Sequence, residues 1–97
     1  MPTYFIMGKF TGQGIKLVKE TTQRSERFRE YAARFGITVK EIYWLMGEYD
    51  VINIVEAPDE ETLSALLLSM GSWGNVRTVT CRAYTRGDMD RVIQKMD

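Results

Sequence analysis

Two segments of this chain carry apolar side chains in both phases of a β-strand, and this feature most constrains how the chain can fold. The segments are Thr3–Phe10 and Val51–Ala57. One phase holds Tyr4, Ile6, Val51 and Val55, and the other holds Phe5, Met7, Ile52 and Ile54. A strand that is apolar on both sides is a central strand covered on both faces. We therefore expect a sheet that needs a cover above and below.

A helical pattern follows the first strand. Residues 15–35 are helical in character, and Thr21 or Thr22 is expected to act as a cap that interrupts or restarts the helix. Its apolar face holds Phe28, Tyr31, Ala32 and Phe35. The charged residues between them are expected to form a solvated face: Arg24, Glu26, Arg27, Arg29, Glu30 and Arg34. Gly36 is placed to end the helix in a left-handed conformation.

The remaining segments predict a hairpin, a second helix, a fourth strand and a short last helix. Residues 37–46 and 51–57 form the hairpin across Gly47–Asp50. Asp59 is the predicted N-cap of a helix that buries Leu63, Leu66, Leu67 and Met70 and ends at Gly71. Residues 76–85 alternate as a strand. Gly87-Asp88 is expected to cap a helix with Met89, Val92, Ile93 and Met96 on one face.

This order, β-α-β-β-α-β plus a terminal helix, predicts an α+β, ferredoxin-like domain. Right-handed crossovers give a four-stranded antiparallel sheet of strand order 4-1-3-2, with both main helices on one face. The other face would leave a large apolar patch exposed on a monomer. We therefore expect the same face of a second subunit to cover it, which makes a dimeric α+β barrel across a two-fold axis.

Composition and charge exclude several classes of function. A chain of 97 residues is expected to form a single domain over residues 1–97. Thirteen basic residues balance thirteen acidic ones, which disfavours nucleic-acid binding. The absence of histidine excludes histidine-ligated metals and every triad with a histidine base. No signal peptide and no apolar run near the length of a membrane span is present, so a cytoplasmic protein is expected.

The hairpin sequence Tyr43–Val51 resembles the signature of the GYD domain family. Similar blocks occur in the family's order at Gly8–Thr11, Gln13–Ile15, Glu56–Asp59 and Gly74–Thr78. The resemblance extends from Pro2 to about Ala83, with two departures: Leu45 and Asn53 stand where a smaller and a less polar residue are expected. It implies a dimeric α+β barrel in bacterial or archaeal cytoplasm. It implies no particular reaction.

Two regions offer candidate ligand-binding residues. In the hairpin, Glu48, Tyr49 and Asp50 could bind a ligand or carry protons, with Tyr43 and Trp44 as polar handles beside them. The structural alternative is that Gly47 and Asp50 shape the turn while Tyr49 packs beside Tyr43 or Trp73. In the second region, Trp73, Asn75 and Arg77 offer an aromatic platform, an amide and a guanidinium. The alternative there is a loop anchored by a half-buried Trp73.

Other motifs favour structural roles. Thr11–Gly14 before a helix is a tight turn rather than an anion site, because it lacks the spacing of a phosphate loop. The acidic residues Glu56, Asp59, Glu60 and Glu61 are explained by helix capping, so no metal site is expected. Cys81, the single cysteine, is expected to be a buried and inert thiol, and the six methionines are expected to fill the core.

Three functional hypotheses stay open. The first is a small-molecule-binding homodimer, or a multiple of it, with a pocket between sheet and helices and no cofactor. The second is a cofactor-independent monooxygenase or isomerase, by analogy with other dimeric α+β barrels. The third is an oligomerisation or ligand-sensing module without catalysis. No nucleic-acid or membrane partner is expected.

Overall fold

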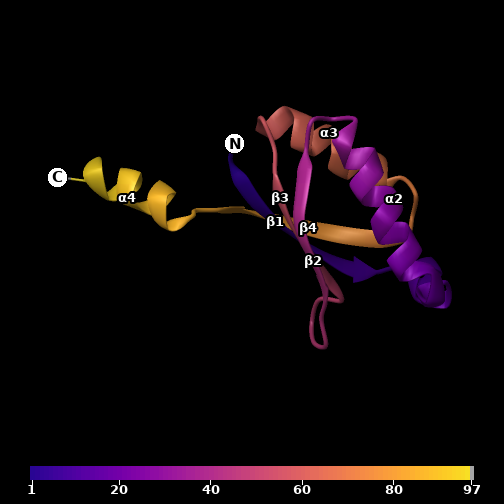
Figure 1. Cartoon of the computed structure of the whole chain (residues 1–97). Helices are drawn as coiled ribbons and strands as arrows, with labels where there is room; N and C mark the ends of the chain where they lie inside the picture. Colours follow the sequence, from indigo (N-terminus) through magenta and orange to yellow (C-terminus); the bar gives the residue numbers. More distant parts are fainter. Residues whose placement is uncertain (97) are drawn as a thin grey trace.

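The computed structural model describes residues 1–96 and confirms the predicted order of helices and strands. The elements are β1 Thr3–Phe10, α1 Gly12–Lys16, the 3-10 helix η1 Val18–Glu20, α2 Thr21–Ala33, β2 Thr38–Trp44, β3 Val51–Glu56, α3 Glu60–Gly71, β4 Val76–Ala83 and α4 Arg86–Gln94. The strands form one antiparallel sheet of order β2-β3-β1-β4, which is the predicted 4-1-3-2 order read from the other edge. Figure 1 shows α2 and α3 packed against this sheet.

The core lies between one face of the sheet and the helices α2 and α3. The sheet contributes Tyr4, Ile6, Val39 and Val55, and the helices contribute Phe28, Ala32, Leu63, Leu66 and Met70. Strand register explains this selection, because Tyr4 is opposite Val55 and Ile6 is opposite Asn53 on the same side of β1 and β3. Residues two apart along a strand share a face, so the first predicted phase is the buried one.

The second predicted phase forms the opposite face of the sheet, which we call the open face: Phe5, Met7, Ile52, Ile54, Val79 and Cys81. Phe5 pairs with Ile54 and Cys81, while Met7 pairs with Ile52 and Val79, so the six side chains adjoin one another. Helices α2 and α3 lie on the other side. The expected burial of Cys81 is wrong for the single chain, where the thiol is exposed. The reason is that Cys81 points to the open face of an edge strand.

The segment between β1 and β2 is less continuous than predicted. In place of one interrupted helix from residue 15, the chain forms α1, the turn η1 and then α2, which begins at Thr21. Thr11 caps α1, since its hydroxyl accepts the Gly14 N–H at 3.0 Å. Thr11–Gly14 is therefore the cap and first turn of a helix, and the predicted tight turn in front of a helix is wrong because the Thr11 hydroxyl caps a helical N–H group. At the far end of α2, Gly36 has a φ of +71°, as predicted for the residue after the helix.

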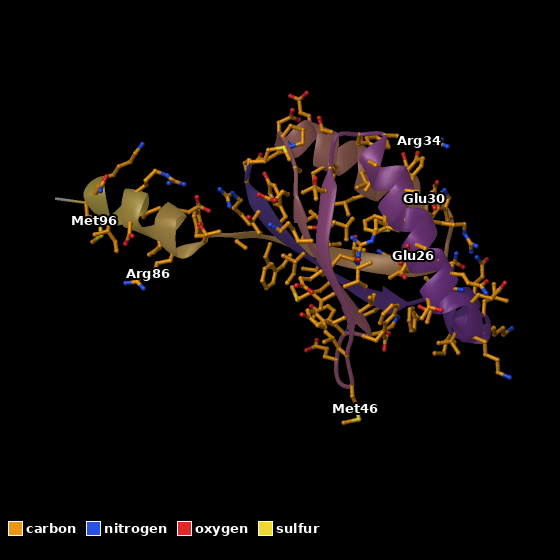
Figure 2. The ribbon with its side chains drawn as sticks, in the orientation of Figure 1. Glu26, Glu30, Arg34, Met46, Arg86 and Met96 are labelled. Atoms are coloured by element: carbon orange, nitrogen blue, oxygen red, sulfur yellow. The ribbon has the colours of Figure 1, made fainter. Side chains whose placement is uncertain are left out.

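The outer side of α2 is the expected solvated face, and Figure 2 shows Glu26, Glu30 and Arg34 along it. Two arginines of the predicted set behave differently. Arg29 donates to the Val39 carbonyl at 2.6 Å, and Arg24 turns toward a cavity under the helix. The expectation that all these side chains are solvated is therefore wrong for Arg24, because it lies on the side of α2 that faces the sheet.

The last helix, α4, projects away from the body of the molecule at the end of β4 (Figure 1). None of its residues is buried. Its N-cap is Thr85, in a capping box with Asp88, and the prediction that Gly87-Asp88 is the cap is wrong. The reason is that the Thr85 hydroxyl accepts the Asp88 N–H while the Asp88 carboxylate accepts the Thr85 N–H, so both residues serve the first turn. Among residues 1–96, no helix has the length and apolar character required to cross a bilayer.

Candidate functional site

A cavity of about 80 Å³ lies between α2 and the sheet, and we call it the α2 cavity. Its lining comes from β1, α2, β3, the end of α3 and the connection to β4: Phe10, Thr21, Arg24, Ser25, Phe28, Val51, Asn53, Met70, Trp73, Asn75 and Val76. Its volume is roughly half that of a 150 Å³ cavity that holds benzene. Most of the lining is apolar, with a few polar groups, which is the usual character of small-molecule sites.

Asn53 is the buried polar residue of this cavity. It sits on β3 between Val51 and Val55, on the face that packs against the helices, and only 8% of it is exposed. It lines the α2 cavity, and among residues 1–96 no fully buried side-chain nitrogen or oxygen lacks a hydrogen-bond partner. An amide in this position is suited to bind a polar atom of a ligand.

Polar groups of Thr21, Arg24 and Asn75 accompany Asn53 around the cavity. The Thr21 hydroxyl accepts a hydrogen bond from the Trp44 indole N–H at 3.0 Å. The Arg24 guanidinium donates to the Leu17 carbonyl at 2.8 Å and to the Gly14 carbonyl at 3.4 Å, which holds it beside the first turn of α2. The Asn75 side-chain oxygen accepts from Gln13 at 2.9 Å. These bonds fix the orientation of each polar group.

Trp73 stands at the edge of the α2 cavity, half exposed, with its ring edge-on to Tyr31 at 5.1 Å. Its backbone carbonyl accepts a hydrogen bond from Gln13 at 3.1 Å. The sequence placed Trp73 and Asn75 in one candidate region, and the structure brings both to this cavity. Arg77, the third member, lies elsewhere: it is exposed and points to the opposite side of β4.

The hairpin candidates Tyr43 and Trp44 lie on opposite faces of the sheet. A shift of register between Val39 and Glu41 precedes them in β2. Tyr43 pairs with Ile52 on the open face, where the neighbouring Glu41 carboxylate raises the pKa of the phenol. Trp44 reaches the start of α2 through its bond to Thr21. The two side chains therefore do not act on one ligand in the single chain.

Glu48, Tyr49 and Asp50 make contacts with β1. The Asp50 carboxylate accepts the Phe10 N–H at 2.8 Å, and the Asp50 N–H donates to the Gly8 carbonyl at 2.8 Å. The Lys9 ammonium lies 3.7 Å from the Glu48 carboxylate and 5.3 Å from the centre of the Tyr49 ring. Asp50 thus holds the turn against β1. The expected packing of Tyr49 on another aromatic ring is replaced by packing against Lys9.

A shallow groove lies beside these residues and contains Arg77. Lys9, Phe10, Thr11, Tyr49, Arg77, Thr78 and Val79 line it. The groove brings Tyr49 and Arg77 together, while Trp73 and Asn75 belong to the α2 cavity. The eight candidate residues from the sequence therefore do not form one site. Two line the α2 cavity, two line this groove, and the other four lie elsewhere in the hairpin. Among residues 1–96, no three His, Cys, Asp or Glu side chains gather as metal ligands would.

Sequence reasoning missed Asn53 and Arg24 as cavity residues. A signal for Asn53 was present, because it interrupts the apolar run V-I-N-I-V of β3 and departs from the family pattern. An amide placed in the buried phase of a central strand is unusual enough to suggest a role. Arg24 carried no such signal, since it is one of several arginines spread along α2.

Comparison with known proteins identifies the family. Residues 4–93 match the GYD domain. The glutamine synthetase and cystathionine beta-lyase binding protein of Thermus thermophilus is 34% identical over 90 residues, which make up 92% of this chain and 95% of that protein.

Two solved structures share the fold. MtbAldR matches with a TM-score of 0.69 at 19% identity, over 88% of this chain and 52% of that chain. TTHA0845 from Thermus thermophilus matches with a TM-score of 0.55 at 27% identity, over 89% of this chain and 100% of that chain. These neighbours have the dimeric α+β barrel fold that the sequence predicted. Since the GYD match spans nearly the whole chain, the protein belongs to the GYD domain family.

Proposed function

We propose that this chain is a homodimeric domain that binds a small molecule in the α2 cavity. The observation that carries the proposal is the amide of Asn53, which lies in the buried phase of a central strand and lines a largely apolar cavity. Asparagine is mostly exposed in proteins, and aliphatic residues usually occupy this phase of a central strand, so an amide there suggests a use. Recognition of a ligand supplies that use.

Binding is favoured over catalysis by the chemistry of the lining. Arg24 is the only residue with an ionisable side chain that lines the cavity within residues 1–96. An arginine keeps its proton at physiological pH and cannot serve as a general base. The remaining polar groups are amides and hydroxyls, which position a ligand. A monooxygenase or isomerase would need a substrate that reacts without a general base from the residues that line the cavity.

The open face supports the homodimer. Four adjoining side chains on its two central strands, Phe5, Met7, Ile52 and Ile54, are apolar, and α2 and α3 cover the other side of the sheet. Pairing two such faces across a two-fold axis would bury both patches at once. It would also bury the Cys81 thiol, which the sequence predicted to be buried.

Filling the cavity tests the ligand-binding function. Ser25 lines the cavity, whereas Ser64 is an exposed residue of α3 outside it. Fragments of about three to six non-hydrogen atoms, drawn from acids, amides, alcohols and hydrocarbons, are screened by thermal shift. We expect at least one to raise the Tm of the native chain and of Ser64→Leu, but not of Ser25→Leu. No response from any fragment, or an equal response from Ser25→Leu, would reject the site.

A second candidate function is binding to another protein. It rests on the 34% identity with a protein named for binding glutamine synthetase and cystathionine beta-lyase, and on the exposed apolar stripe of α4. The test is co-sedimentation with these two enzymes from the organism that encodes the chain. Val92→Glu lies in the stripe, and Gln94→Glu is a control on the same helix. Loss of binding in the first variant alone would support the candidate, and no co-sedimentation of the native chain would reject it.

A further inference from the structure

We infer that the ligand of the α2 cavity is a short-chain monocarboxylate. This inference rests on the proposed function and adds the chemical class of the ligand. It depends on which hydrogen-bonding atoms around the cavity are still free once the bonds within the chain have been assigned. The bonds within the chain fix the orientation of several polar side chains around the cavity. In all but one of these side chains, the hydrogen-bonding groups that stay free are donors.

The orientation of Asn75 can be deduced from its neighbour. The Gln13 side-chain nitrogen donates both to the Trp73 backbone carbonyl at 3.1 Å and to the Asn75 side chain at 2.9 Å. A backbone carbonyl only accepts, so the Gln13 atom must be the nitrogen. The Asn75 atom that faces it must then be the oxygen. The Asn75 side-chain nitrogen, with two N–H groups, is the end left for a ligand.

Thr21 is constrained in a similar way. Its hydroxyl oxygen accepts the Trp44 indole N–H, which is a group that only donates. The hydroxyl hydrogen is free to be donated to a ligand. Ser25 is the exception, because its hydroxyl donates to the Thr22 carbonyl at 2.6 Å and retains lone pairs. The Asn53 amide can supply either a donor or an acceptor.

Charge favours an anion over a neutral acceptor. Arg24 is the single charged residue among the cavity residues within 1–96. Two of its five N–H donors are used on the Leu17 and Gly14 carbonyls, so three are left. Thr21 is also the first residue of α2, and the N-terminal end of a helix carries partial positive charge. A carboxylate accepts hydrogen bonds at both oxygens and matches this arrangement.

The walls and volume limit the rest of the ligand. The apolar lining of Phe10, Phe28, Val51, Met70 and Val76 holds no charged group. A volume of about 80 Å³ is near half of a cavity that takes benzene, so it encloses a few non-hydrogen atoms. An aliphatic tail of about three carbons fills this volume, and the carboxylate would then lie with the donors at the edge of the cavity. A dicarboxylate would bury its second charge against carbon, which is strongly unfavourable.

The test compares two probes of equal shape, isobutyrate and isobutyramide, at pH 7. The full-length chain is labelled with ¹⁵N and each probe is titrated by NMR, with the side-chain signals of Asn53 and Arg24 as local reporters. We expect isobutyrate to move both signals and to bind about 10–100-fold more tightly than isobutyramide, the difference between a charged and a neutral hydrogen bond. Equal binding, or tighter binding of isobutyramide, would overturn the carboxylate assignment.

The outcomes separate this inference from the proposed function. If isobutyrate fails while another class of fragment stabilises the native chain and not Ser25→Leu, the ligand class is wrong and the cavity is still a binding site. If no fragment of any class binds, both are wrong.

Two variants distinguish recognition from a scaffold role. Asn53→Leu should leave the Tm of the ligand-free chain unchanged or higher, because leucine suits an apolar wall, and weaken isobutyrate binding about tenfold or more. Arg24→Gln should reduce the preference for isobutyrate over isobutyramide. Arg27→Gln, on the exposed side of α2, should leave that preference unchanged. A lower Tm in Asn53→Leu, or an intact preference in Arg24→Gln, would show that these side chains only support the fold.

Discussion

The Cα atom of Gly14 lies directly against the backbone carbonyl of Asn75, so that a methyl group on Gly14 would overlap the carbonyl oxygen. Hydrogen bonds join the same two segments: the Thr11 N–H donates to the Asn75 carbonyl at 3.1 Å, and the Thr11 hydroxyl donates to the Gly74 carbonyl at 2.6 Å. The turn after β1 is thus bound to the connection before β4. Asn75, which lines the α2 cavity, is positioned by this contact.

Gly14→Ala is therefore expected to destabilise the chain by about 1–3 kcal/mol, because the backbone must move to admit the methyl group. Gly12→Ala is the matched control. It lies in the same short helix, and no atom of residues 1–96 outside its immediate surroundings comes within 4 Å of the added carbon. Alanine stabilises a helix by roughly 0.5–1 kcal/mol relative to glycine. Urea unfolding of both variants measures the difference. A Gly14→Ala variant as stable as Gly12→Ala would show that the contact can relax.

Asp50 and Glu48 provide a second comparison within one turn. Asp50→Ala removes the acceptor of the partly buried Phe10 N–H, so we expect a loss of about 1–3 kcal/mol in the free energy of unfolding. Glu48→Ala breaks an exposed ion pair with Lys9 and should change stability by less than about 1 kcal/mol. The two unfolding curves decide whether Asp50 is structural. Equal curves would return Asp50 to the list of ligand-binding candidates.

Two aspartates predict how stability depends on pH in acid. The Thr62 backbone N–H lowers the pKa of Asp59, and the Thr85 backbone N–H lowers the pKa of Asp88, both from an ordinary value of 3.8. The stability that each carboxylate contributes is therefore fully present above about pH 4 and is lost as pH falls through the lower, folded pKa. Asp59→Asn keeps a cap and loses the titration, so its unfolding temperature should fall less steeply below pH 4.

Glu60→Gln is the control for this pH dependence, since Glu60 lies in the same helical turn, where the capping bond described within residues 1–96 is made by Asp59. Its acid profile should follow that of the native chain. If Asp59→Asn and the native chain lose stability in parallel between pH 4 and pH 2, the cap does not contribute to acid unfolding.

The open face predicts the assembly. Sedimentation at micromolar concentration should give a mass of at least twice 11.2 kDa. Ile54→Glu places a charge in the centre of the apolar patch and should yield monomers, whereas Leu68→Glu, exposed on α3, should not. A native chain that sediments at 11.2 kDa would refute the barrel.

Trp73 and Arg77 are expected to differ in their effect on stability. Trp73→Ala removes the contact with the Tyr31 ring and part of the cavity wall, and should cost about 1–3 kcal/mol, because the indole is half exposed. Arg77 is exposed, and Arg77→Ala should change the free energy of unfolding by about 0.5 kcal/mol or less. Urea denaturation of both variants is the measurement. If Arg77→Ala lowers the free energy of unfolding more than Trp73→Ala does, Arg77 supports the fold rather than a binding site.

The fold could be predicted from the sequence because apolar residues recur with the period of a strand or of a helix. The alternation in β1 and β3 assigned Ile6 and Val55 to one face and Met7 and Ile54 to the other, and strand pairing preserves that assignment. The cap at Asp59 and the left-handed conformation of Gly36 could also be predicted, because both depend on hydrogen bonds between residues that are close in the chain.

Tertiary structure alone decided which candidate residues share a site. Tyr43 and Trp44 are adjacent in the sequence but lie on opposite faces of β2, whereas Asn53 and Arg24 are far apart in the sequence and line one cavity. The same holds for Cys81, whose exposure depends on what covers the open face rather than on its neighbours in β4. Alternation determines the face on which a side chain lies. The packing of α2 over β3 determines which side chains meet, because such contacts join residues that are distant in the chain.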